Sequence, residues 1–95
     1  MTDHDPLAEL AQCRGEIEDL DRRLIGLLAD RVALGKRTAA LKTAAGLPIL
    51  DPQREAEVIR RAVVTAREHD LPVEAVREVF WHVVGLSRRA QEAGQ

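Results

Sequence analysis

The chain has 95 residues, of which 45% are hydrophobic, and a formal net charge of −2 at pH 7. This length allows one domain with one core, which we expect over residues 1–95, with residues 1–5 as a disordered tail. The low net charge gives no general reason to bind nucleic acid or an anionic membrane, since both require a basic face. No run of about 18 apolar residues suggests a membrane span, and the N-terminal sequence is acidic rather than basic and then apolar. We therefore expect a cytoplasmic protein that binds neither nucleic acid nor membrane.

The composition favours an all-α fold, because aromatic residues make up only 2% of the chain and alanine, leucine, arginine and glutamate are frequent. One long helix is expected over residues 7–43, with Asp5 as its cap, Pro6 in its first turn and Gly46 at its end. Two rows of apolar residues recur along it every seven positions, the spacing of a helix that packs against another helix along its length: Leu10, Ile17 and Leu24, and Cys13, Leu20, Leu27, Leu34 and Leu41. We expect Cys13 to be a small buried thiol on this seam.

The length of this helix predicts a homodimer. At about 1.5 Å per residue it would exceed roughly 50 Å, whereas a compact chain of this size has a radius of gyration of about 12 Å. One chain cannot cover such a seam. The next position of the first row is Arg31, and an arginine is almost never fully buried without a partner, so we expect an anion near it.

Two shorter helices are expected to follow. Asp51 and Pro52 form a strong helix start, and this second helix should run to about His69 with Glu55 on its apolar side. After the break at residues 70–72, a third helix should run from about Val73 to Gln91. Its apolar face, which we expect to be buried, carries Val76, Val79, Phe80, Val83, Val84 and Leu86 and continues through Ser87 and Gln91. Polar side chains thus occupy positions that should face inward.

Nucleophilic and metal chemistry are disfavoured. Ser87 is the only serine, and the three histidines and one cysteine show neither a catalytic triad nor a metal-ligand spacing. No glycine-rich phosphate loop follows a strand. We expect no metal site.

The remaining candidates are polar residues on inward faces or at a helix start: Arg31, Lys42, Asp51, Arg54, Glu55, Ser87 and Gln91. Arg31 and Lys42 are eleven residues apart, about three turns and 16 Å along the axis, so they point in nearly the same direction. Two such cations can converge on a small dianion. Arg14 lies seventeen residues before Arg31, about 25 Å away, and could reach the same ligand only from the partner chain of an antiparallel dimer.

These residues, in this order, resemble the all-helical class of chorismate mutases over residues 7–92. The local strings agree as well: Leu20-Asp21 and Leu27-Leu28 lead to Arg31 in the first helix, and Asp51-x-x-Arg54-Glu55 opens the second. The resemblance implies an intertwined homodimer of three-helix protomers, in which each site borrows one arginine from its neighbour. It also implies an isomerase of aromatic amino acid biosynthesis, in the shikimate pathway, that rearranges chorismate to prephenate without a cofactor or covalent intermediate.

The resemblance assigns a role to each matching position. Arg14 from the partner and Arg31 would pair with the two substrate carboxylates, with one more hydrogen bond from Ser87. Lys42 and Gln91 would donate to the ether oxygen. Glu55, with Asp51 beside it, would accept the ring hydroxyl, and Arg54 would add positive potential and orient Glu55. We expect Asp21 to be structural and the side chain of Arg88 to be solvated.

Other interpretations stay open at this point. The same scaffold also serves a lyase that eliminates pyruvate from isochorismate, although such enzymes tend to lack the acidic pair that matches Asp51 and Glu55. A mutase that acts on an amino-substituted chorismate is a close variant, and a helical dimerisation module without catalysis belongs to another class. Individually, the charged residues also have plainer explanations, such as a surface ion pair between Arg14 and Glu18.

Overall fold

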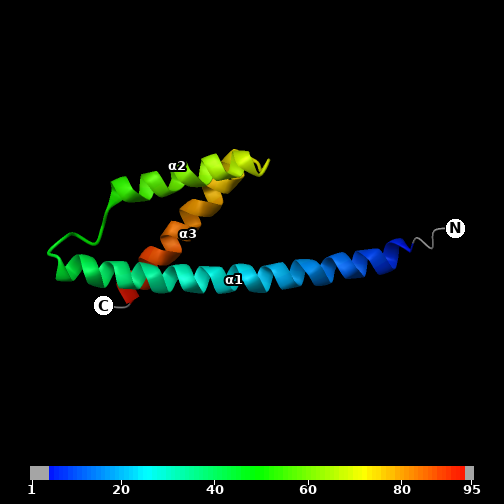
Figure 1. Ribbon diagram of the computed structural model, residues 1–95, viewed down its shortest axis with the longest axis horizontal. Helices are drawn as coiled ribbons and strands as arrows, with labels where there is room; N and C mark the ends of the chain where they lie inside the picture. Colours follow the sequence, from blue (N-terminus) through cyan, green and yellow to red (C-terminus); the bar gives the residue numbers. More distant parts are fainter. Residues whose placement is uncertain (1–4, 94–95) are drawn as a thin grey trace. The chain divides into compact units, whose positions relative to one another are not determined.

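The computed structural model describes residues 5–93, which form three α-helices: α1 (Pro6–Ala44), α2 (Pro52–Glu68) and α3 (Val73–Ala93) (Figure 1). The described residues contain no strand, so the prediction of an all-α chain with a long first helix is confirmed. Four of the five residues expected to form a tail, residues 1–4, lie outside the described part. The chain divides into two compact units, residues 1–30 and 31–95. No helix in the described part is both long and apolar enough to cross a lipid bilayer.

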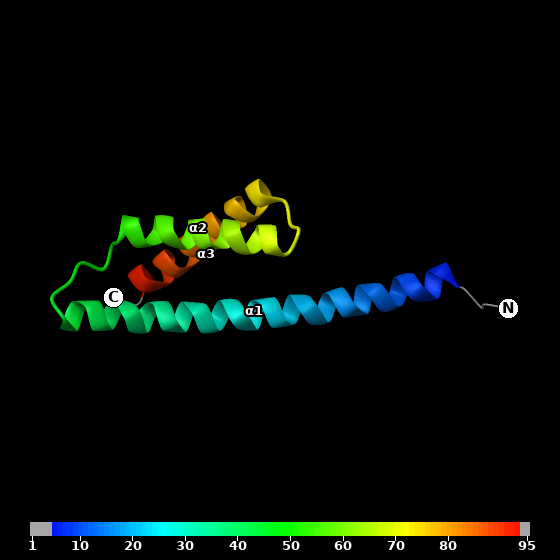
Figure 2. The ribbon, with the colours of Figure 1, turned by 45° about the horizontal axis from the view of Figure 1, so that its top comes forward.

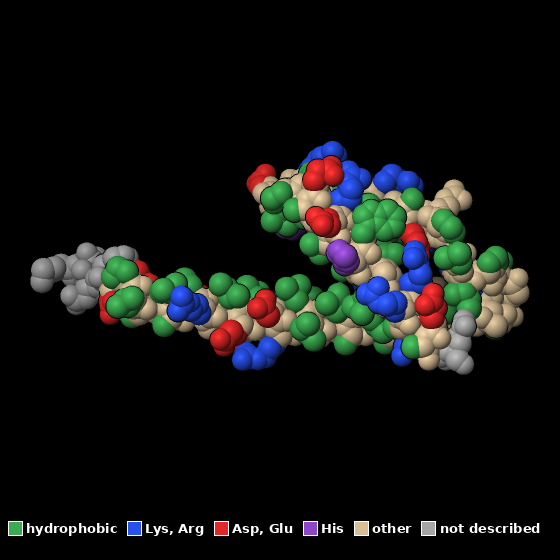
Figure 3. Space-filling model, turned by 180° about the vertical axis from the view of Figure 1, so that it is seen from behind, with side chains coloured by type: hydrophobic (Ala, Val, Ile, Leu, Met, Phe, Trp, Pro, Cys, Tyr) green, Lys and Arg blue, Asp and Glu red, His purple; other side chains and the backbone are tan. Residues whose placement is uncertain are grey.

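The first unit is the N-terminal part of α1. Its start follows the predicted cap, because Asp5 Oδ1 accepts a hydrogen bond from the backbone N–H of Leu7 at 3.1 Å and Pro6 is the first helical residue. None of its described residues is buried, and the heptad leucines are open to solvent, with Leu24 57% and Leu27 64% exposed. Apolar side chains are visible along this helix in Figure 3. The prediction of a buried thiol is wrong for the single chain, since a lone helix has no second surface to cover Cys13.

In the second unit, α1 ends with a left-handed turn. The N–H of Leu47 donates to the carbonyl of Lys42 at 2.8 Å, and Gly46 has φ +74°. This combination is the Schellman arrangement, in which glycine adopts a backbone conformation that other residues rarely reach. The chain then passes through residues 45–51 to α2, whose N-cap is Asp51, as predicted.

The core of the second unit lies between α2 and α3, the two helices that pack against each other (Figure 2). The buried apolar residues of α2 are Ile59, Ala62, Val63 and Ala66, and Val84 of α3 is also buried. Three of these α2 residues share the face predicted from their spacing, with Glu55 at its N-terminal end. The apolar side of α2 therefore brings an acidic side chain to the edge of the core.

The predicted inner face of α3 is only partly covered. Val84 and Ser87 are buried, whereas Val79 is 57% and Leu86 37% exposed. Expecting both to be buried was wrong for the single chain. Val79 and Leu86 are seven residues apart and therefore share one side of the helix, and this side is left open to solvent.

Candidate active site

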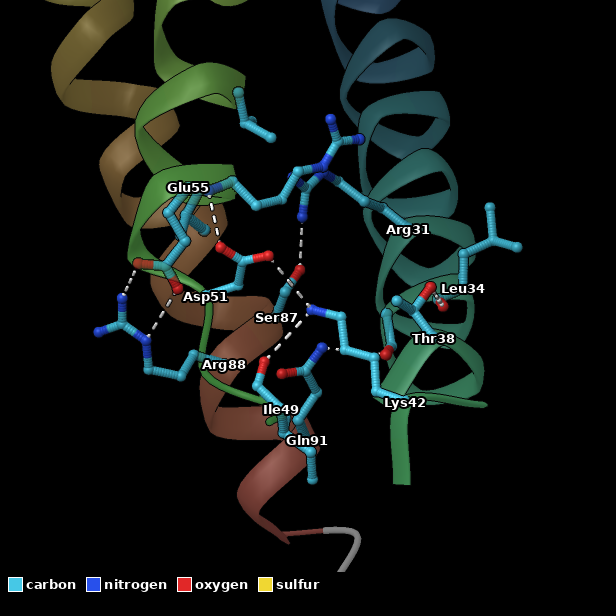
Figure 4. Close-up of a pocket in the computed structure, with 14 residues that line it drawn as sticks. Arg31, Leu34, Thr38, Lys42, Ile49, Asp51, Glu55, Ser87, Arg88 and Gln91 are labelled. Atoms are coloured by element: carbon cyan, nitrogen blue, oxygen red, sulfur yellow. Dashed lines mark hydrogen bonds and ion pairs between the residues drawn. The ribbon is translucent and has the colours of Figure 1, made fainter. Parts of the chain in front are cut away.

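A cavity of about 320 Å³ lies within the second unit (Figure 4). Its walls come from the C-terminal part of α1, the segment that leads to α2, the first turns of α2 and the C-terminal half of α3. Four apolar side chains contribute to the wall: Leu34, Ile49, Val58 and Val84. The remaining lining is glycine and polar or charged side chains.

Seven of the eight site residues predicted from the sequence line this cavity: Arg31, Lys42, Asp51, Arg54, Glu55, Ser87 and Gln91. Thr38 lines it as well. The eighth residue, Arg14, belongs to the first unit and is exposed there. The suggested surface pair with Glu18 is not found, because Glu18 lies 3.9 Å from Arg22 instead. Within the described residues, Arg14 has no ion-pair partner.

Arg31 lies half-buried against α3. Its Nη1 donates to Ser87 Oγ at 2.6 Å, and Ser87 is only 8% exposed. Among residues 5–93, no carboxylate pairs with this guanidinium. A guanidinium has five N–H donors, so most of those of Arg31 remain for an anion. The expected anion is therefore not a side chain of the described part of this chain.

Lys42 lines the same cavity nearer the C-terminus of α1, and its side chain is 24% exposed. Its Nζ donates to the carbonyl of Ile49 at 3.3 Å and lies 4.0 Å from Asp51 Oδ2. The other oxygen of Asp51 accepts the backbone N–H of Arg54 at 3.0 Å, which satisfies one free donor at the helix start. One carboxylate thus caps α2 and holds Lys42 at the cavity.

Gln91 and Gly35 join α3 to α1. The amide Nε2 of Gln91 donates to the carbonyl of Gly35 at 2.9 Å. A Cβ at position 35 would lie 3.4 Å from that nitrogen and 3.8 Å from Ser87 Cβ. A methyl group at Gly35 would therefore meet both polar side chains of α3 at ordinary van der Waals distances, which shows how closely they lie to the backbone of α1.

Glu55 is paired with Arg88. Arg88 Nε donates to Glu55 Oε2 at 3.2 Å, and Arg88 Nη2 donates to Oε1. Arg88 is exposed, as predicted, but the prediction missed its pairing with Glu55. The prediction that Arg54 orients Glu55 was wrong, because the guanidinium of Arg54 lies 3.5 Å from Glu57. The sequence did contain a signal for Arg88: together with Val84, Ser87 and Gln91 it forms a helical stripe at i, i+3, i+4 and i+7.

The cavity carries a net positive charge. Four cationic side chains line it, Arg31, Lys42, Arg54 and Arg88, against two acidic ones, Asp51 and Glu55, which gives a formal charge of +2. This charge is complementary to a small dianion. In the part of the chain that the structure describes, no group of three or more His, Cys, Asp or Glu side chains is arranged to hold a metal ion.

Comparison with known proteins decides which family has this fold and charge pattern. The family described as chorismate mutase type II matches residues 13–92. This chain belongs to the chorismate mutase type II family. The predicted resemblance to the all-helical class, and the predicted enzyme type, an isomerase, are thereby confirmed.

The relatives include a protein named as a chorismate mutase and proteins named as bifunctional chorismate mutase/prephenate dehydratases. The chorismate mutase of Methanocaldococcus jannaschii is 28% identical over 86 residues, which cover 90% of this chain and 87% of that protein. The bifunctional chorismate mutase/prephenate dehydratase of Aquifex aeolicus is 31% identical over 82% of this chain, and the Escherichia coli K12 protein of that name is 29% identical over 98%. This chain spans only 22% and 23% of those two bifunctional proteins. Nothing in these matches favours the lyase, the amino-chorismate mutase or the non-catalytic module.

Proposed function

We propose that this family member rearranges chorismate to prephenate in the cavity between α1, α2 and α3. The observation that carries the proposal is the convergence of Arg31, Lys42, Ser87 and Gln91 from two helices on one cavity with a formal charge of +2. Chorismate is a dianion with an ether oxygen and a ring hydroxyl, and the cavity offers cations, amide donors and carboxylates to match. The relatives named for chorismate mutase support the same reaction.

The reaction needs positioning and charge stabilisation. One C–O bond of the ether breaks as one C–C bond forms, within a single molecule, so no proton transfer or covalent intermediate is required. A site accelerates such a step by holding the flexible diacid in its folded, reactive conformer and by placing fixed donors where negative charge develops.

Arg31 would bind one substrate carboxylate through its free N–H groups, with Ser87 fixing the guanidinium. Lys42 and Gln91 would donate to the ether oxygen. Each keeps donors free for this purpose, because an ammonium has three N–H groups and an amide has two. Neither role needs a cofactor.

The acidic pair would recognise the ring hydroxyl. A carboxylate accepts hydrogen bonds, so Glu55 can accept one from the O–H group of the ring hydroxyl. Asp51 would act beside it, while holding Lys42 and the helix start. Because isochorismate lyases on this scaffold tend to lack the matching acidic pair, the presence of Asp51 and Glu55 favours the mutase.

We also propose a homodimer in which Arg14 of one chain completes the cavity of the other. The apolar heptad residues of the first unit are solvent-exposed, with Leu20 50% and Ile17 55% exposed. Burial of such a row against a second copy would be strongly favourable at about 25 cal/mol per Å². Arg14 has no ion-pair partner in the described chain. Its place in an antiparallel pair would supply the second carboxylate of chorismate with a guanidinium.

The test is turnover of chorismate by purified protein, followed by the loss of absorbance and by identification of the product. The proposal predicts prephenate in an amount equal to the chorismate consumed. Pyruvate release from isochorismate without conversion of chorismate would indicate the lyase. No turnover of either compound would leave the amino-chorismate mutase and the non-catalytic dimerisation module, which turnover of an amino-substituted chorismate would separate. A cytoplasmic location stays a prediction from composition.

A further inference from the structure

We propose that Arg88 is a positioning residue for this reaction. It holds the carboxylate of Glu55 in the orientation that accepts a hydrogen bond from the ring hydroxyl of the substrate. The inference rests on the proposed function and adds to it a residue on α3 that touches the acid and not the reacting atoms. It follows from the geometry of the Arg88–Glu55 pair and from the ion pairs that Arg54 and Lys42 form with other carboxylates.

The pair is bidentate. Arg88 donates through Nε to one oxygen of Glu55 and through Nη2 to the other. A planar guanidinium fork that contacts both oxygens fixes the plane of the carboxylate as well as its position. Each carboxylate oxygen retains a second lone pair, so the pair leaves Glu55 able to accept a hydroxyl.

Arg88 is also the only cation in the described residues that pairs with Glu55. Arg54, one residue away, interacts with Glu57, and Lys42 interacts with Asp51. Figure 4 shows Arg88 and Lys42 on opposite sides of the two carboxylates. The Glu55 side chain is 21% exposed and that of Arg88 43%, so the pair lies where the cavity lining meets solvent.

Loss of Arg88 should therefore weaken substrate binding through Glu55. A freed glutamate samples several rotamers, and fixing it on binding costs conformational entropy. The ring hydroxyl does not react, so its hydrogen bond forms in the ground state and the transition state alike, and its loss raises KM with little change in kcat. We expect Arg88→Met to raise KM about tenfold, within the range of coupled neighbouring residues, and to change kcat less than about threefold.

The experiment is a double-mutant cycle in the chorismate assay with wild type, Arg88→Met, Glu55→Gln and the double variant. If Arg88 acts through Glu55, the substitution raises KM about tenfold in the wild-type background and less than about twofold in the Glu55→Gln background. Equal effects in both backgrounds would overturn the proposal, because they would mean that Arg88 acts on the substrate independently of Glu55. A loss of kcat at unchanged KM would also overturn it, because binding of the ring hydroxyl by Glu55 would then not depend on Arg88.

Two further variants sharpen the cycle. Arg89→Met removes the same charge from the exposed neighbouring residue and should leave KM at the wild-type value. Arg88→Lys keeps the charge without the fork, should give an intermediate KM, and replaces Arg88→Met in the cycle if far-UV circular dichroism shows that the latter has lost helix. An inactive wild type would refute the proposed function together with this role, whereas an active wild type with additive effects would refute the role alone.

Discussion

Lys42 provides a direct test of charge stabilisation in the cavity. Lys42→Gln removes one positive charge from a lining of formal charge +2 at a side chain that is 24% exposed, and it leaves Asp51 without its cationic neighbour. Removing one preorganised donor from a developing oxyanion costs roughly 10²–10³ in kcat, about 3–4 kcal/mol. Because Lys42 would act on charge that appears as the C–O bond breaks, we expect kcat to fall by about this factor while KM changes less than about threefold.

The assay is the initial rate of chorismate loss over a range of substrate concentrations. Lys36→Gln is the matched control, since Lys36 is exposed on the same helix, and it should keep wild-type kcat and KM. If Lys42→Gln retains kcat within about threefold of wild type, the assignment of Lys42 to the ether oxygen is refuted. A loss confined to KM would instead assign Lys42 to a substrate carboxylate.

Substitutions at three further positions test the surroundings of the cavity. Ser87→Ala removes the acceptor that fixes Arg31 at 2.6 Å and should raise KM about tenfold in the same assay, the typical value of a hydrogen bond to a charged group; an unchanged KM would contradict the role of Ser87. Gly35→Ala places a methyl group 3.4 Å from Gln91 Nε2, an ordinary contact. The higher helix propensity of alanine should therefore raise the free energy of unfolding in urea by up to about 1 kcal/mol. A lower free energy of unfolding would mean that α1 and α3 pack more tightly than described. Asp51→Ala removes the cap of α2 and should lower the free energy of unfolding by about 1 kcal/mol, whereas Asp51→Asn should retain it; equal losses in both variants would contradict a cap.

The helices were predictable because their signals are local. The seven-residue leucine spacing, the caps Asp5 and Asp51, and Gly46 at the end of α1 depend on neighbours in the sequence and the geometry of one helix. The inward positions of Arg31 and Glu55 were predictable for the same reason, since polar residues interrupt apolar faces there.

The pairings between helices were not predictable in this way. Whether Glu55 contacts Arg54 or Arg88 depends on how α2 and α3 pack, and a helical wheel of either helix alone does not contain that information. The exposure of Val79 and Leu86 has a similar cause, because periodicity identifies an apolar face but not the surface that covers it.

The most direct test of the account is complementation between Arg14→Ala and Arg31→Ala. Each homodimer should be nearly inactive, since every site then lacks one guanidinium. In a mixture refolded from equal amounts, half of the dimers are mixed and one of their two sites carries both arginines, so activity should return to about a quarter of wild type. No recovery in a sample whose mixed dimers are seen by native mass spectrometry would contradict a site shared between two chains.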